Sequence, residues 1–402
     1  MAESVFDVGR GGSHVADVDA GGEMDENVLA RVAWGRIAEP CDLQAGALVA
    51  HLGHVAALRW LRSTRAEPPP GLWPVPVWER ARARWSPRVE GLDPAREVAG
   101  IRRLGGRVIV PGDPAWPTAL DDLDVLAPHC LWARGDASIL SGPAVAIVGA
   151  RASTGYGEHV AGELSASLAD SGLAVVSGGA YGIYAVAHRA ALAVGGATVA
   201  VMAGGLDRFY PAGNADLLAR VAREGAVVAE LGPGSSPSRS RFLTRNRLIA
   251  ALAGACVVVE AGWRSGTLST AMHASRLLRP VAAVPGPVTS AASAGCHRLI
   301  REGVAVCVSD AAQVRELLAS AGEDLVVEPT DDAVRRPGDT PPGLEASHAQ
   351  VWEALPARGS ATLESVARVG GLAAREVRIA LGALELAGHV RREGDRYRRT
   401  PR

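Results

Sequence analysis

The chain has 402 residues, of which 48% are hydrophobic and 21% charged, and its formal net charge is −1. This length predicts two or three globular domains. The near-zero charge excludes a global basic field, so nucleic-acid binding would require a local patch. All 42 residues counted as lysine or arginine are arginines, whose planar fork suits phosphates and base faces.

The cysteines and the N-terminal sequence predict the cellular compartment of the protein. Five cysteines are scattered along the chain without any Cys-x-x-Cys pair, which predicts neither a disulfide framework nor a zinc site. The sequence has no signal-peptide pattern and no run of 18 apolar residues. We therefore expect a cytoplasmic protein without a membrane span.

The N-terminal quarter is predicted to be helical after a disordered start. Residues 1–24 are rich in Gly, Asp and Ala, which is typical of disorder. Residues 25–95 show apolar residues at helical spacing and are expected to form a helical, SAM-like domain. Trp78 and Trp85 lie seven residues apart with three arginines between them. This pattern fits nucleic-acid stacking, but a core stripe with a solvated face is the favoured interpretation.

Residues 100–320 alternate between strand and helix patterns and predict a doubly wound, mostly parallel, Rossmann-like α/β domain. The strand candidates are nearly continuous runs of Val, Ala and Ile, as expected when helices cover both faces of a sheet. Helices are expected at 183–194 and 267–278. The predicted strands are 144–148, 173–177, 198–202, 226–230, 256–260 and 280–284.

Two glycine-rich turns follow the first two of these strands. The first contains Gly149 and Arg151, and the second contains Ser177, Gly178 and Gly179. A strand, a tight turn and a helix N-terminus together direct unsatisfied N–H groups toward an anion, so these turns predict phosphate binding. Neither the lysine-containing phosphate loop nor the dinucleotide glycine spacing is present. A nucleotide, a dinucleotide and a nucleic-acid backbone all remain candidate ligands.

An arginine window lies between Glu230 and Glu260, where no acidic residue occurs. Residues 233–237 are predicted to be a loop and residues 245–253 a helix. One interpretation is a groove in which arginines track phosphates and the ring of a phenylalanine stacks on a base. The other is a solvated arginine face with that phenylalanine in the core, and composition does not separate the two. The window contains Arg239, Arg241, Phe242, Arg245, Asn246 and Arg247.

A third turn, with Ser265, Gly266 and Thr267, follows another predicted strand. It is explained either by a plain helix cap or by a further phosphate contact. Three such turns at one sheet edge favour a shared ligand groove. His188 falls inside a predicted helix and is expected to be a packed residue. No catalytic residue, metal ligand cluster or cofactor is predicted.

The C-terminal part is predicted to be a small domain on a linker. Residues 321–345 are acidic and rich in Pro and Gly, which is typical of a linker. Residues 346–402 predict a winged helix, with a hairpin at 388–399 following the third helix. The three expected helices are 348–355, 362–369 and 373–387.

Seven short motifs, in order along the chain, make residues 100–310 similar to the DNA-processing protein A family (DprA, also called Smf). They include Val148-Gly149-Ala150-Arg151, Ser177 to Gly182, Gly205 to Pro211, Phe242 to Ala250 and Arg264 to Leu268. The resemblance implies a non-enzymatic, homodimeric protein that binds single-stranded DNA and loads the RecA recombinase during DNA uptake and recombination. The DNA-contacting residues that it implies are Arg151, Ser177, Gly178, Gly179, Arg239, Arg241, Phe242, Arg245, Asn246 and Arg247.

The second turn departs from the family pattern. Tyr181 and Tyr184 stand where the family usually has arginine and aspartate, and in the first turn Ala150 replaces a serine. These changes predict weaker DNA binding unless Tyr181 stacks on a base. Two alternative functions are a phosphoribohydrolase-like enzyme acting on nucleoside monophosphates and a duplex-DNA regulator acting through the winged helix.

Overall fold

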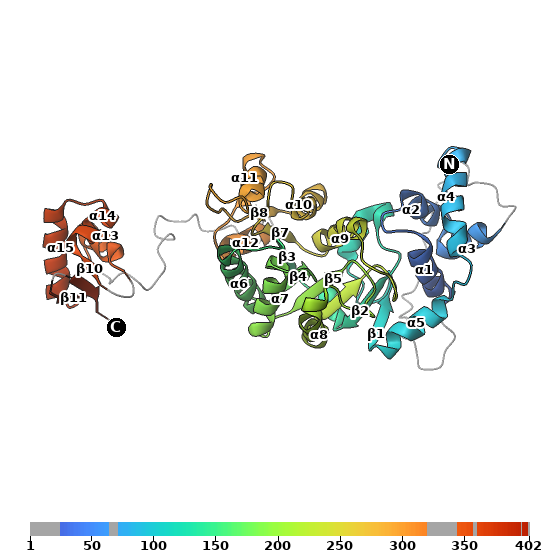
Figure 1. Ribbon diagram of the computed structural model, residues 1–402, viewed down its shortest axis with the longest axis horizontal. Coiled ribbons are helices and arrows are strands. Elements are labelled where there is room, and N and C mark those ends of the chain that lie inside the picture. Colours follow the sequence, from blue (N-terminus) through green and yellow to red (C-terminus); the bar gives the residue numbers. More distant parts are fainter. Residues whose placement is uncertain (1–24, 64–70, 320–343, 357–359, 395, 401–402) are drawn as a thin grey trace, which may run out of the picture. The chain divides into compact units, whose positions relative to one another are not determined.

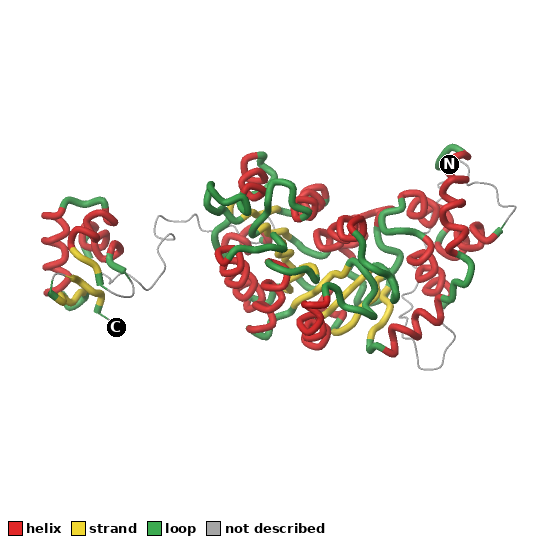
Figure 2. Tube along the Cα trace, in the orientation of Figure 1, coloured by secondary structure: helices red, strands yellow, loops and turns green. Residues whose placement is uncertain are grey.

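The computed structural model describes residues 25–63, 71–319, 344–356, 360–394 and 396–400. The chain forms two compact units, residues 1–319 and 320–402 (Figures 1 and 2). The predicted disordered start and most of the predicted linker lie outside the described residues. No helix within the described ranges has the length and apolarity that a membrane crossing needs. All five cysteines are free thiols, and Cys130, Cys256 and Cys296 are buried.

The N-terminal helices pack around tryptophans. Trp78 and Trp85 are each about 1% exposed, and the rings of Trp34 and Trp85 meet edge to face at 5.4 Å. The indole N–H of Trp85 donates to Asp42. The core-stripe interpretation of the tryptophans is therefore confirmed. The helices are α1 (Glu26–Ile37), α2 (Leu43–Leu52), α3 (His54–Arg62), α4 (Val75–Trp85) and α5 (Pro94–Arg103).

A nine-stranded sheet in the order β1-β2-β6-β5-β4-β3-β7-β8-β9 forms the centre of the first unit (Figure 2). The strands from β6 to β9 are parallel, while β1 and β2 extend one edge in antiparallel fashion. All six predicted strands are confirmed to within two residues. The short strands β1, β2 and β9 were not predicted. The bounds are β1 (Gly106–Ile109), β2 (Leu131–Gly135), β3 (Ala144–Val148), β4 (Ala174–Gly178), β5 (Thr198–Met202), β6 (Ala226–Ala229), β7 (Ala255–Val258), β8 (Val281–Ala283) and β9 (Val306–Cys307).

Helices cover both faces of this sheet, so each central strand is buried on two sides. Along β3, Val145 and Ile147 belong to one core cluster while Ala146 and Val148 belong to the other. This double burial is the reason for the continuous apolar runs in the sequence. One face is covered by α6 (Gly155–Asp170), α7 (Ile183–Ala193), α8 (Ala215–Glu224) and α12 (Ala311–Leu318). The other is covered by α9 (Arg239–Ala251), α10 (Thr267–Arg276) and α11 (Ala294–Arg301).

Helix α9 begins six residues earlier than predicted. Ser238 is its N-cap, and the hydroxyl of Ser238 accepts a hydrogen bond from the amide of Arg241. The first three residues of α9, Arg239 to Arg241, are polar, so apolar periodicity could not reveal where the helix begins. This earlier start places all six residues named for the arginine window, from Arg239 to Arg247, on one helix.

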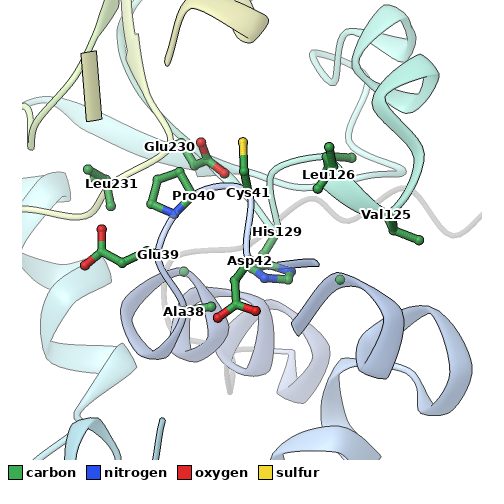
Figure 3. Close-up of a pocket in the computed structure, with 13 residues that line it drawn as sticks. Ala38, Glu39, Pro40, Cys41, Asp42, Val125, Leu126, His129, Glu230 and Leu231 are labelled. Atoms are coloured by element: carbon green, nitrogen blue, oxygen red, sulfur yellow. The ribbon is translucent and has the colours of Figure 1, made fainter. Parts of the chain in front are cut away.

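The N-terminal helical region contacts the α/β domain at the loop that precedes α9 in the sequence. Arg36 of α1 donates to the carbonyl of Pro233 and to the hydroxyl of Ser235. Figure 3 shows a small cavity nearby, between the α1–α2 loop, residues 125–129 and Glu230. Its volume of about 20 Å³ corresponds to roughly one water molecule, so it is too small for an organic ligand.

The second unit is a three-helix domain with a three-stranded sheet in the order β10-β12-β11, which is the predicted winged helix. Gly371 ends α14 in the left-handed conformation. The strand β10 was not predicted. The elements are α13 (Ala346–Ala354), β10 (Ala361–Thr362), α14 (Leu363–Gly370), α15 (Ala374–Leu386), β11 (Val390–Glu393) and β12 (Arg396–Arg399).

Candidate nucleic-acid interface

The candidate site lies where the strand order reverses. Strands β3 and β7 are neighbours, with Val148 opposite Val258, although more than 100 residues separate them in the chain. From β3 the chain continues to β4 and then β5 on one side of this pair, whereas from β7 it continues to β8 on the other side. The turns that follow β3 and β7 therefore leave the same sheet edge side by side. Ligands of doubly wound sheets bind at such a switch point.

A cleft of about 810 Å³ opens at this edge. Its lining includes the guanidinium groups of Arg151, Arg239, Arg245 and Arg264. Aspartate, glutamate and histidine are all missing from the described residues that line it. The cleft is therefore cationic even though the whole chain is nearly neutral. Nine of the predicted site residues line it: Gly149, Arg151, Arg239, Phe242, Arg245, Asn246, Ser265, Gly266 and Thr267.

Arg245 is a buried cation at the floor of the cleft. The residue is 4% exposed, and its guanidinium donates to the carbonyl of Val201. A side chain at Gly178 would meet the guanidinium nitrogens at 2.6 Å, so only glycine permits this approach. Among the described residues Arg245 has no ion pair, and its Nε has no hydrogen-bond partner. Burial, assisted by the nearby charge of Arg151, lowers the pKa of Arg245 to about 10. A buried charge is costly without a counterion, so this position is prepared for an anion.

Phe242 lies at the cleft wall, next to two guanidinium groups. The Cζ atom of Arg151 is 4.5 Å from the ring centroid and that of Arg245 is 5.8 Å away. The ring of Tyr210 lies 6.0 Å from that of Phe242. The Phe242 side chain is half-buried and lines the cleft. This position supplies an aromatic face beside cationic groups, as cation–π geometry requires.

The three turns are joined by hydroxyl groups. The hydroxyl of Thr267 donates to the carbonyl of Gly149 over 2.7 Å and lies 3.2 Å from the Tyr184 hydroxyl. Tyr184, one of the departures from the family pattern, is buried and thus links the second turn to the third. The amide of Thr267 donates to the Ser265 hydroxyl. The network fixes the relative positions of the turns and uses the Thr267 hydroxyl, which is therefore not available to a phosphate.

Five predicted contact residues do not line the cleft: Ser177, Gly178, Gly179, Arg241 and Arg247. Ser177 is fully buried and donates to the carbonyl of Ile147. Arg241 points to Glu39 and to the carbonyl of Ser236.

Arg247 is 1% exposed and forms a 2.7 Å ion pair with Glu230. It also donates to the carbonyl of Leu126. These contacts correct the expected role of Arg247: the pairing is internal, and the guanidinium is covered by protein. The glycines of the second turn lie next to the cleft and not in its lining: Gly178 lies against the guanidinium of Arg245, and Gly179 lines a neighbouring small pocket.

Nine residues that line the cleft were not predicted as site residues, among them Arg264 and Tyr210. Arg264 precedes Ser265 in the third turn, and Tyr210 follows β5, so the rule that ligands bind beyond strand ends could have found both. Tyr181 is exposed over Gly213, outside the residues that line the cleft.

Two titratable residues near the turns have structural roles. Glu260 is buried and accepts hydrogen bonds from the amide and the hydroxyl of Thr154, the N-cap of α6. His188 is packed, as predicted, with its ring nitrogens on Thr198 and on the carbonyl of Gly178. Burial lowers the pKa of His188 to about 4.

Fold and site together define a Rossmann-like protein with a cationic cleft at the switch point and a winged helix after it. Family models agree with both parts: "DNA recombination-mediator protein A" matches residues 107–319, and the DprA winged helix domain matches residues 335–396. The chain belongs to the DprA/Smf family.

The relatives cover most of the chain. A putative DNA processing protein DprA of Mycobacterium tuberculosis is 44% identical over 387 residues, which are 93% of this chain and 95% of that protein. A protein Smf of Synechocystis is 32% identical, covering 77% of this chain and 84% of that protein. The crystal structure of DprA from Streptococcus pneumoniae superposes with a TM-score of 0.58 and 29% identity, over 73% of this chain and 98% of that one.

Proposed function

We propose that the protein binds single-stranded DNA in the cationic cleft, without catalysing a reaction on it. The observation that carries this proposal is Arg245, a buried guanidinium at the carboxyl ends of β4 and β5 that has no acidic partner in the part of the chain that the structure describes. A phosphate oxygen is the counterion that fits, because guanidinium groups bind phosphates through strong, charge-assisted hydrogen bonds.

The rest of the cleft supports a strand rather than a single phosphate. Four arginines offer sites for successive phosphates, and Phe242 offers an aromatic face for a base. Single-strand binding proteins combine these two features, since stacking does not depend on sequence. In a duplex the faces of the bases are covered by the neighbouring base pairs, so a ring that stacks on a base favours an unpaired strand.

We further propose that the protein acts as a homodimer and loads the RecA recombinase onto the bound strand during DNA uptake and recombination. Membership of the family supports this step. A direct test follows RecA filament assembly on single-stranded DNA that is already coated with a single-strand binding protein. The chain should accelerate assembly, and the Arg245→Met variant should not.

The binding test compares a labelled oligonucleotide as a single strand and as a duplex, by fluorescence anisotropy with the full chain. The single strand should bind more tightly. Its affinity should fall with salt at a log–log slope near −3, from four phosphates at about 0.7 each. Equal affinity for both forms, or an affinity that is flat in salt, would contradict the assignment of the cleft.

The winged helix supports a second DNA contact. Four arginines of its hairpin are exposed: Arg391, Arg392, Arg396 and Arg398. Their charges suit sequence-independent contacts to the phosphates of a duplex. Deleting residues 340–402 should then weaken duplex binding and leave single-strand binding nearly unchanged.

A further inference from the structure

Trp263 stands out among the aromatic residues of the chain because it is exposed. Of the nine tryptophans in the sequence, Trp263 alone is exposed, with 52% of its surface accessible. It lies in the loop between β7 and α10, directly before Arg264, which lines the cleft. A large aromatic side chain in water loses the free energy that burial would provide, so such exposure indicates a binding surface.

The indole ring is held in place by a cation. The Cζ atom of Arg298 on α11 lies 5.5 Å from the ring centroid. The Nε of Arg298 in turn pairs with Glu302 at 3.1 Å. This arrangement restrains the ring from one side and leaves half of its surface accessible, which reduces the entropy lost when a flat partner stacks on it.

Trp263 and Tyr210 mark opposite sides of the cleft along the sheet edge. Tyr210 follows β5 and Trp263 follows β7, and the strand order β5-β4-β3-β7 separates them by three steps. Neighbouring strands lie about 4.8 Å apart, so this stretch of the edge is about 14 Å wide. Arg151 follows β3, in the middle of this stretch. A polynucleotide lying across the strand ends would meet aromatic, cationic and aromatic groups in turn.

We propose that Trp263 is a second stacking platform, at which one base of the single strand stacks where the strand leaves the cleft on the β7 side. The proposal rests on single-strand binding in the cleft and adds the direction of the strand, across the sheet edge from β5 toward β7. Arg298 is a positioning residue that orients the ring, and Arg264 joins the platform to the cleft.

The test measures affinities of the full chain for oligo(dT) of increasing length, with Trp263→Leu and Trp263→Phe. The Leu variant should bind long oligonucleotides about 5- to 150-fold more weakly, which is the range for the loss of one stacked base. The Phe variant should keep most of the affinity because it keeps an aromatic face. The shortest oligonucleotides that bind should show no difference, because they fill the cleft without reaching the platform. Val194→Ala, at an exposed apolar position after the end of α7, is the matched control and should bind like the wild type.

Intrinsic fluorescence provides a second readout. Because Trp263 is the one exposed tryptophan, oligonucleotide binding should quench part of the wild-type emission, and Trp263→Phe should bind without that quenching. If the wild type binds single strands and Trp263→Leu binds oligonucleotides of every length as tightly as the wild type, the stacking platform at Trp263 is refuted. Single-strand binding in the cleft is then still supported. If the wild type binds no single strand, both proposals fail.

Discussion

Arg245 and Arg247 lie two residues apart on α9, and replacing each with methionine should have opposite consequences. Methionine keeps an unbranched, helix-compatible side chain and removes the charge. Arg245 is a buried cation without an acidic partner, whereas Arg247 is paired with Glu230. The two variants therefore distinguish an arginine that binds a ligand from an arginine that stabilises the fold.

The structure supplies the expected magnitudes. The pKa of Arg245 falls from 12.5 to about 10, mainly through burial, which means that folding disfavours its charge by about 3 kcal/mol. Arg245→Met should therefore leave the free energy of unfolding unchanged or raise it by up to about 3 kcal/mol. Arg247→Met leaves Glu230 without its partner and should lower the free energy of unfolding by about 3–5 kcal/mol.

Urea denaturation at pH 7 measures both stabilities, and anisotropy with labelled oligo(dT) measures binding by the folded proteins. Arg245→Met should lose 10- to 150-fold in affinity, the equivalent of about 1.5–3 kcal/mol for a hydrogen bond to a charged group. Folded Arg247→Met should bind like the wild type. The reasoning is refuted if Arg245→Met destabilises the fold as much as Arg247→Met and binds DNA with unchanged affinity.

Three further predictions follow from the same contacts. Phe242→Leu should weaken single-strand binding about 5- to 150-fold at every oligonucleotide length, by anisotropy, because the ring lies within the cleft; an equal affinity would mean that Phe242 only fills space. Glu39→Gln should free Arg241 from its ion pair, so titration with oligo(dT) should show tighter binding and a salt slope steeper by about 0.7 if Arg241 then reaches a phosphate. Acidification should destabilise the fold, because His188 has a pKa of about 4 when folded and 6.5 ordinarily, so below pH 6.5 the unfolded chain binds the proton first. By pH 5 this loss is about 2 kcal/mol, and urea denaturation of His188→Asn should show that much less decrease between pH 7 and 5.

Local sequence patterns were sufficient for most of the α/β domain. The runs of β3, β4 and β5 are apolar throughout because both faces of these strands are covered, and the glycine turns follow at the predicted positions. The start of α9 was missed because its first three residues are polar and it is fixed by the Ser238 cap. The antiparallel strands β1 and β2 were missed because they combine apolar with polar residues.

The sequence by itself determined that this protein has a doubly wound α/β domain, a winged helix and an arginine-rich window next to glycine turns. It could not determine which arginines of that window face a ligand. Successive residues of an α-helix are rotated by about 100°, so Arg245 and Arg247 point in nearly opposite directions. Only the packing of α9 against β4, β5 and Glu230 decided that Arg245 faces the cleft while Arg247 is neutralised within the protein. The counterion of each arginine comes from another element of the chain or from a ligand. The local sequence around an arginine therefore does not predict which of the two it is.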